Sequence, residues 1–231
     1  MQIFARHRPG THTRGEDTRR RILETALEIF ASEGYEGAST RLLAERAGVN
    51  LPAIQYYFGS KEGLYRAVIQ SIAESTEAHM APVTAKVRVV LERPDAKREE
   101  LLELLCQMLE AFVALVSGSD TLAESKRQLF ARAEVEDTPG LEELHESGMR
   151  HVFQPCLELI GRLLGRATED QETLLSTLTA FGQATIFCDK AVRRVLNLDE
   201  FTEEQVRAIQ RMVRAHTEAI FKAPRARAGR R

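Results

Sequence analysis

The chain has 231 residues, 43% of them hydrophobic and 29% charged, with a formal net charge of −2, 7 prolines and no tryptophan. This size and composition favour a helical protein with a substantial core, either one large domain or a small domain followed by a larger one. No apolar run of about eighteen residues and no charged-then-apolar leader is present, so we expect a cytoplasmic protein without a membrane partner.

Residues 1–15 have no helical period and carry three arginines beside a Pro-Gly turn. Disorder is the simplest interpretation, and a basic arm that enters the minor groove of DNA is the functional alternative. From Glu16 to Ala31 the apolar residues follow helical spacing, which predicts a first helix that Gly34 ends.

Residues 39–61 are typical of two short helices around a glycine turn, the geometry that places a helix in the major groove of DNA. Ser39 is a good cap for the first of them, and Gly48 provides a left-handed turn at its end. Asn50 is a good cap for the second helix, with Pro52 in its first turn, where a missing N–H breaks no helical bond.

The second short helix is predicted to have an inner and an outer face. Ile54 and Phe58 are four residues apart and are expected to face inward. This leaves four side chains on the outer face, suited to phosphate and base-edge contacts: Leu51, Pro52, Gln55 and Tyr56.

Residues 18–69 resemble the N-terminal domain of the TetR family of bacterial transcriptional regulators. The motifs that carry the resemblance, in chain order, are Phe30 followed by Gly34-Tyr35, then Leu43-Ala44, Ala47-Gly48-Val49, Tyr57-Phe58, Ser60-Lys61-Glu62 and Leu64. Asn50, Leu51 and Gln55 depart from the usual pattern where base preference is set.

The resemblance and the exposed face together imply contacts with a palindromic double-stranded DNA operator. The residues expected at base edges or the groove wall are Leu51, Pro52, Ala53, Gln55 and Tyr56, beside Asn50. The residues expected to hold phosphates are Thr40, Arg41, Tyr57 and Lys61.

A fourth helix is predicted to begin near Ser60 and to stop near His79, because Pro82 makes continuation unfavourable. This divides the chain into a flexible basic arm (1–15), a helix-turn-helix DNA-binding domain with its linking helix (16–80), a larger ligand-binding and dimerisation domain (81–223) and a basic tail (224–231). Residues 1–70 hold 10 basic against 8 acidic residues, whereas residues 71–221 hold 17 against 26, so phosphate would be repelled by the body.

The larger domain is predicted to be helical throughout, giving an all-α fold of about nine helices in total. We expect helices over 97–117, 121–133, 139–164 (kinked or divided at Pro155), 168–196 and 202–221. The stretch HVFQPCLELIGRLLG resembles the C-terminal domain of a TetR subgroup that includes the CecR-type regulators.

The last two helices carry apolar stripes that would be ordinary core in a monomer. The family resemblance implies instead a homodimer whose interface is a four-helix arrangement, and Gly182 suits the close approach of a partner helix. The residues expected at this interface are Leu178, Phe181, Gly182, Ile186, Val206, Ile209, Val213 and Ile220.

A small-molecule effector is expected to bind between the helices of the larger domain, in a mostly apolar cavity with a few polar groups. The candidate walls are Met108, Phe112, Phe130 and Phe153, and the candidate polar groups are Arg127 and His145. The alternative is that the apolar four are core and Arg127 lies on a solvated face.

Neither a cofactor nor a metal site is expected. The three cysteines are far apart and are interpreted as buried thiols, with a redox sensor as the alternative, and His145 and His151 do not share a helix face. No nucleophile elbow, P-loop, HExxH motif or dinucleotide turn occurs, so we expect no enzyme. We expect a ligand-responsive dimeric repressor; the rival interpretation is a helical interaction or scaffold module without specific DNA binding.

Overall fold

A computed structural model describes residues 14–117, 122–136, 138, 150–188, 190–195, 197–198 and 201–222. All secondary structure in these residues is helical, which confirms the predicted all-α class. Ten α-helices and one short 3-10 helix lie in this part of the chain, against about nine predicted. None of these helices is long and apolar enough to cross a membrane. Most of the predicted arm, the basic tail and His145 lie outside the described residues.

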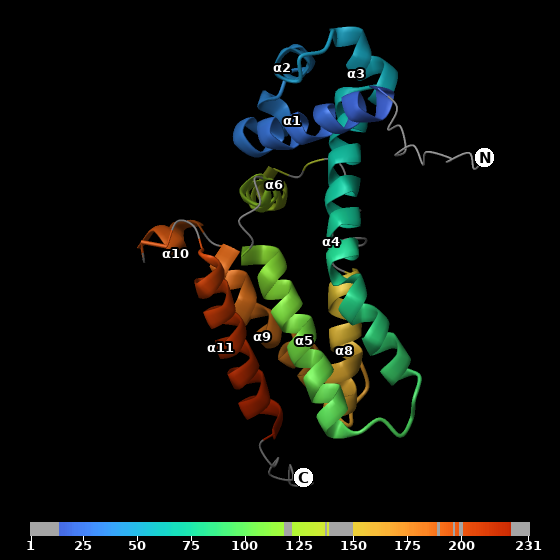
Figure 1. Cartoon of the computed structure of the whole chain (residues 1–231), viewed down its shortest axis with the longest axis vertical. Helices are drawn as coiled ribbons and strands as arrows, with labels where there is room; N and C mark the ends of the chain where they lie inside the picture. The colour runs from blue at the N-terminus through green and yellow to red at the C-terminus, as the bar shows by residue number, and fades with distance from the viewer. Residues whose placement is uncertain are drawn as a thin grey trace, which may run out of the picture.

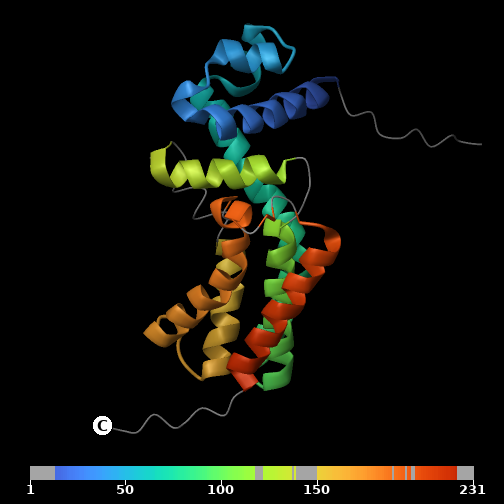
Figure 2. The same cartoon turned by 90° about the vertical axis from the view of Figure 1, so that its left-hand side faces the viewer.

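Figures 1 and 2 show a small head and a larger body joined by one long helix. The head contains α1 (Arg14–Gly37), α2 (Thr40–Arg46), α3 (Leu51–Phe58) and the first half of α4 (Lys61–Leu91). The body contains the second half of α4 with α5 (Arg98–Ser117), α8 (Arg150–Leu164), α9 (Gln171–Thr185) and α11 (Glu203–Lys222). Helix α6 (Ala123–Glu136) lies between head and body, and η2 (Ile186–Cys188) and α10 (Lys190–Val195) follow α9.

One apolar cluster holds the head together. Ile22 and Phe30, on the same face of α1, are fully buried, and Ile54 of α3 packs into the same cluster. Tyr65 of α4 meets the Phe30 ring edge to face, with 4.9 Å between centroids. The burial of this face follows from the helical spacing of the apolar residues in the sequence.

The end of α1 differs in part from the prediction. Gly34 has φ 76° and ψ 172°, values outside the helical region that only glycine adopts readily. Helical turns nevertheless resume after it and continue to Gly37. Gly34 therefore breaks α1 where expected without ending it.

The prediction that Pro82 stops the fourth helix is wrong, because α4 continues through it. A proline cannot donate to the carbonyl four residues back, here Ala78, but both residues are exposed and water can satisfy that carbonyl. Met80 and Val83, on either side of the proline, are buried in the body and hold the helix in place. The division of the chain into domains near residue 80 stays a prediction.

Helix α5 is the central helix of the body, in contact with α4, α8, α9 and α11. Arg98 at its start donates to the carbonyl oxygens of Leu163 and Phe221 at 2.5 Å each, near the ends of α8 and α11. Arg162 donates to the carbonyl of Arg93, just after α4, at 2.8 Å. Helix ends leave carbonyls without donors, so each arginine satisfies these groups and complements the helix dipole.

The stretch predicted as one helix over 168–196 is divided into α9, η2 and α10. The α9 helix begins after Asp170, whose carboxylate accepts from the backbone N–H of Glu172 at 2.9 Å. The turn after α9 brings the buried side chain of Arg193 to Glu124 of α6, with 3.0 Å between Nη2 and Oε2. This long-range ion pair accompanies a break that carries no glycine or proline signal. The predicted division of a helix at Pro155 does not occur, because α8 continues through this residue.

Helix α6 connects the head to the body through packing and hydrogen bonds of its side chains. Its Leu129 is 2% exposed and belongs to the apolar cluster of the head. Arg132 donates to the carbonyl oxygen of Ser32 at 2.7 Å, and the N–H of Tyr35 donates to Glu136 at 3.3 Å. The ion pair between Arg132 and Glu136 thus satisfies backbone groups on both sides of the break at Gly34.

The other end of α6 is bound to the body through Glu124. Its carboxylate accepts from Gln128, Arg127 and Arg193, and Arg127 also donates to the carbonyl oxygen of Val116 in α5 at 3.1 Å. Burial alone would raise the pKa of Glu124, but these hydrogen bonds lower it to about 2.

This lowered pKa predicts a specific acid sensitivity. Because the ordinary value is 4.5, ionised Glu124 stabilises the fold above about pH 4.5, and that contribution is lost as the pH falls towards about 2. Urea unfolding of the wild type and of Glu124→Gln should differ most near neutral pH and converge on acidification. Glu203→Gln, at an exposed position, should follow the wild-type curve, and a constant gap for Glu124→Gln would contradict the assignment.

Candidate nucleic-acid interface and body sites

The turn between α2 and α3 has the geometry that its sequence predicts. The Ser39 hydroxyl accepts from the N–H of Leu42 at 3.1 Å, which caps α2. Gly48 has φ 61°, and the N–H of Val49 donates to Ala44 O at 3.0 Å, a Schellman ending. The Asn50 side chain then accepts from the N–H of Ala53 at 3.0 Å and caps α3 at once.

The outer face of α3 is exposed as predicted. Tyr56 is 83% exposed and Leu51 50%, and Pro52 and Gln55 are also exposed. Ile54 on the opposite side is 2% exposed. A helix of eight residues is not stable alone, so α3 depends on the packing of its neighbours. The apolar side chains that it exposes to water indicate a contact surface.

The other candidate DNA contacts flank this face. Arg41 and Asn50 are exposed, whereas Thr40, Ala53 and Tyr57 are half-buried. The rings of Tyr56 and Tyr57 meet edge to face at 5.0 Å, so the two tyrosines support each other. Arg41, at the start of α2, is the basic member of this group with the greatest access to a phosphate.

Lys61, which is expected to hold a phosphate, also has a partner within the structure, and its contact with DNA stays a prediction. Its Nζ donates to the carbonyl oxygen of Tyr35 at 2.9 Å and lies 4.4 Å from the centre of the Tyr35 ring. The ammonium group therefore binds the start of α4 to Tyr35, just after the break in α1. Sequence reasoning missed this because the two residues are far apart in the chain.

Gly63 is a further positioning feature that sequence reasoning did not single out. A Cβ at this position would lie 2.1 Å from the carbonyl oxygen of Phe58, far inside contact distance. Only glycine lets the first turn of α4 pack this closely against the end of α3.

The candidate effector residues do not converge on one site. Met108 and Phe112 are buried in the body, and Phe153 stacks on Phe181 with 4.1 Å between centroids. Phe130, however, packs against the head cluster on α6, and the nearby Arg127 is bound as described above. Phe130 therefore lies in a different cluster from Met108, Phe112 and Phe153, and the effector cavity stays a prediction.

The candidate dimer residues fall into two groups. Leu178, Gly182, Ile186 and Ile220 are exposed, as an interface between copies requires. The expectation is corrected for Phe181, Ile209 and Val213, which are at most 4% exposed and belong to the core of the chain itself. Val206 is half-buried, and its place at an interface stays a prediction.

The exposed apolar side chains gather on the same helices. Ten large ones are exposed in the described part of the chain, and six of these lie on α9, η2 and α11. Three of the six were not predicted, because a helical stripe does not show which of its two edges packs inward. The six are Leu174, Leu175, Leu178, Ile186, Met212 and Ile220.

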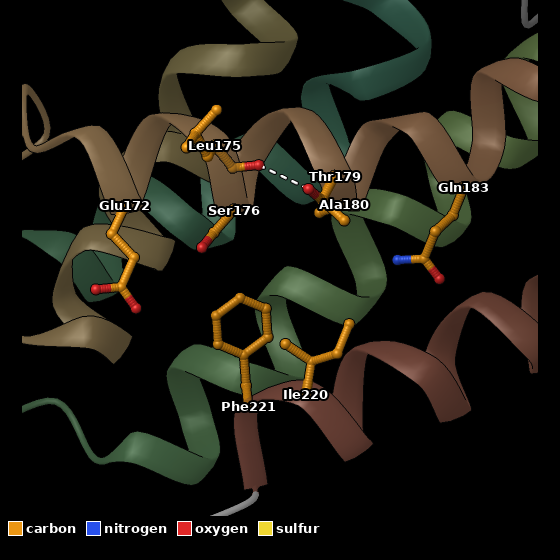
Figure 3. A pocket seen from close by; sticks show the side chains of 8 residues that line it. All are labelled: Glu172, Leu175, Ser176, Thr179, Ala180, Gln183, Ile220 and Phe221. Atoms are coloured by element: carbon orange, nitrogen blue, oxygen red, sulfur yellow. Dashed lines mark hydrogen bonds between the residues drawn. The ribbon is translucent and has the colours of Figure 1, made fainter. Parts of the chain in front are cut away.

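A hollow of about 180 Å³ lies between α9 and α11 on this face. Figure 3 shows Ile220 and Phe221 below it and the α9 side chains above it. Gln183 closes one end, and its buried Nε2 has no hydrogen-bond partner within the described structure. The hollow is thus apolar with a few polar groups at its edge.

The cysteines whose side chains are described are buried thiols. Cys106 is 1% exposed and Cys156 is 0% exposed, and neither forms a disulfide. Burial raises the pKa of Cys106 to about 11 and raises the pKa of Cys156 as well. Thiols in this state are unreactive near neutral pH. The side chain of Cys188 lies outside the described residues.

Two family models match the chain. The model "Bacterial regulatory proteins, tetR family" matches residues 22–68, and the model "HTH-type transcriptional dual regulator CecR, C-terminal domain" matches residues 101–223. The first covers the helix-turn-helix head, and the second covers most of the body.

Whole-chain relatives agree with these matches. The HTH-type transcriptional dual regulator CecR of Shigella flexneri is 27% identical over 215 residues, which cover 92% of this chain and 95% of that protein. Among solved structures, GusR of Salmonella enterica has a TM-score of 0.60 at 16% identity, covering 93% of this chain and 100% of that one. FadR of Bacillus subtilis in complex with stearoyl-CoA has a TM-score of 0.57 at 17% identity, covering 86% and 96%. The two structures show a common fold only.

Substitutions at Gln55 of α3 and at Arg41 of α2 are expected to have separable effects on DNA binding. Gln55→Ala should change base preference, since a good bidentate contact discriminates by about 1–3 kcal/mol. Arg41→Ala should weaken binding to all sequences and lower the salt slope by roughly one unit. Binding-site selection and salt titration measure the two effects, and an unchanged preference would remove Gln55 from direct readout.

Proposed function

The chain belongs to the TetR family of transcriptional regulators and carries a CecR-type C-terminal domain, and from this premise we propose a specific function. It is a homodimeric, ligand-responsive repressor that binds a palindromic operator in the cytoplasm and is released by a small-molecule effector. The observation that carries the proposal is the exposed outer face of the capped helix α3. Footprinting on the DNA upstream of its own coding region tests it. A scaffold module would leave no palindromic protection, and a reporter whose expression falls when the protein is absent would indicate activation.

The six exposed apolar side chains on α9, η2 and α11 support the dimer. A group of large exposed apolar side chains on neighbouring helices is unusual on a monomer and is typical of an interface. An added Cβ at Gly182 would meet no atom of the described structure within 4 Å, so packing inside the subunit places no demand for glycine there. An isologous dimer with this face at its centre would place two copies of α3 about 34–36 Å apart, one turn of B-DNA.

Two variants on this face test the dimer without touching the core. Leu178→Glu and Gly182→Leu should give helical monomers that bind an operator half-site weakly, because a charge or a bulky side chain prevents the two faces from meeting. Sedimentation measures the oligomeric state. Val89→Glu, at a site 61% exposed on α4, is the matched control and should remain dimeric. An intact dimer in both test variants would refute this interface.

Effector release requires a connection from the body to the head, and α4 and α6 provide two. Both helices contribute to the apolar cluster of the head, and both are bonded to the body. At the head end, Arg132 and Glu136 of α6 hold the two sides of the break at Gly34. An effector that prefers a body conformation in which α6 shifts would therefore change the head through these bonds.

The coupling is measurable with an effector found by screening small aromatic and amphipathic compounds for thermal shift. A compound that weakens operator binding by some factor must itself be weakened by the operator by the same factor, since coupling is reciprocal. Arg132→Ala should reduce that factor while leaving the affinity of the compound for the protein alone unchanged. Arg166→Ala, which removes an ion pair with Asp170 in the body, is the control. An undiminished factor in Arg132→Ala would exclude the α6 route.

A further inference from the structure

Two arginines on α1 reach across to the helix-turn-helix at separate points. The Nε of Arg21 donates to the carbonyl oxygen of Ala47 at 3.1 Å. The guanidinium of Arg19 lies over the ring of Phe58, 5.4 Å from its centre. Both contacts join residues more than twenty positions apart in the sequence.

These contacts lie just before and at the end of α3. Ala47 is the C-cap of α2 and precedes Asn50, the N-cap of α3, by three residues. Phe58 is the last residue of α3. The carbonyl of Ala47 belongs to a helix end without an intrahelical donor, so the cationic Arg21 also complements the dipole of α2.

Helix α3 is short, so each contact near its ends helps to determine its direction. Its one fully buried side chain is Ile54, near its middle. Tyr57 and Phe58 pack partly against the head cluster, and Gly63 lets α4 approach the end of α3, so the tilt of the helix depends on contacts near its ends. The contacts of the two arginines add to this constraint from α1.

We propose that Arg21 and Arg19 are positioning residues, which set the angle at which α3 presents Gln55 and Tyr56 to DNA. The proposal rests on the proposed function, because it takes α3 as the element that reads DNA. Neither arginine needs to touch DNA for this role.

Arg20 is the matched control, since it lies between the two on the same helix and carries the same charge. Its side chain is 69% exposed and pairs with Asp17 within α1 at 3.4 Å. On a duplex obtained by binding-site selection with the wild type, Arg21→Ala should lose about tenfold in affinity, as expected for a lost charge-assisted hydrogen bond. Arg19→Ala should lose about threefold, and Arg20→Ala should stay within about twofold.

Three readouts separate positioning from other roles. The salt slope should be unchanged in Arg21→Ala, and a slope lower by about one unit would make Arg21 a phosphate ligand instead. The loss of DNA affinity caused by Arg21→Ala should be smaller in a protein that already carries Gln55→Ala. If the losses of the two substitutions simply add, Arg21 has only a general stabilising role. Arg21→Lys, which keeps a cationic donor, should restore most of the affinity. Equal losses in Arg20→Ala and Arg21→Ala would overturn the proposal.

A measurement without DNA distinguishes this proposal from the proposed function. Amide hydrogen exchange over residues 51–58 should be faster in Arg21→Ala than in the wild type, while exchange in α8 should be unchanged. Unchanged exchange in α3 would overturn the positioning role even if DNA binding is confirmed. If binding-site selection finds no preferred DNA sequence but amide exchange in α3 is still faster in Arg21→Ala than in the wild type, only the DNA-reading function is overturned.

Discussion

The arrangement of this molecule depends on one continuous helix shared by two apolar cores. Helix α4 places Leu64 and Val68 in the cluster of the head and Met80 and Val87 in the core of the body. A helix whose two halves are packed in different cores cannot rotate in one core without disturbing the packing in the other. Pro82, which lies in the body half of α4, does not interrupt the helix, so the orientation of α3 is tied to the body through α4.

Helix α6 adds a second connection of a different kind. Its contact with the head combines a buried leucine, Leu129, with charged side chains that satisfy the backbone at the break in α1. Such bonds depend on direction, so a displacement of α6 breaks the hydrogen bonds to Ser32 and Tyr35 beside Gly34. Lys61 binds the same turn from α4. The α1 break is therefore the place where both connections meet.

The face of α9 and α11 shows how an amphipathic helix can have two apolar surfaces. Phe181 and Ile209 point into the subunit, while Leu178 and Ile220 on the same helices are exposed. A single stripe in the sequence contains both sets, since neighbouring positions on a helix differ by about a hundred degrees. The inward set stabilises the core of the chain itself, and the outward set forms the surface of the proposed dimer.

The sequence by itself determined the local features, namely the all-helical class, the capped turn at Ser39, Gly48 and Asn50, and the exposed face of α3. The physical reason is that a cap or a left-handed turn involves groups within a few residues of one another. The tertiary structure alone decided the course of α4 through Pro82, the break after α9 and the binding of Lys61 to Tyr35. Each of these depends on a partner that distant sequence brings into place, such as the Arg193 contact with Glu124 on α6, and no local pattern records such a partner.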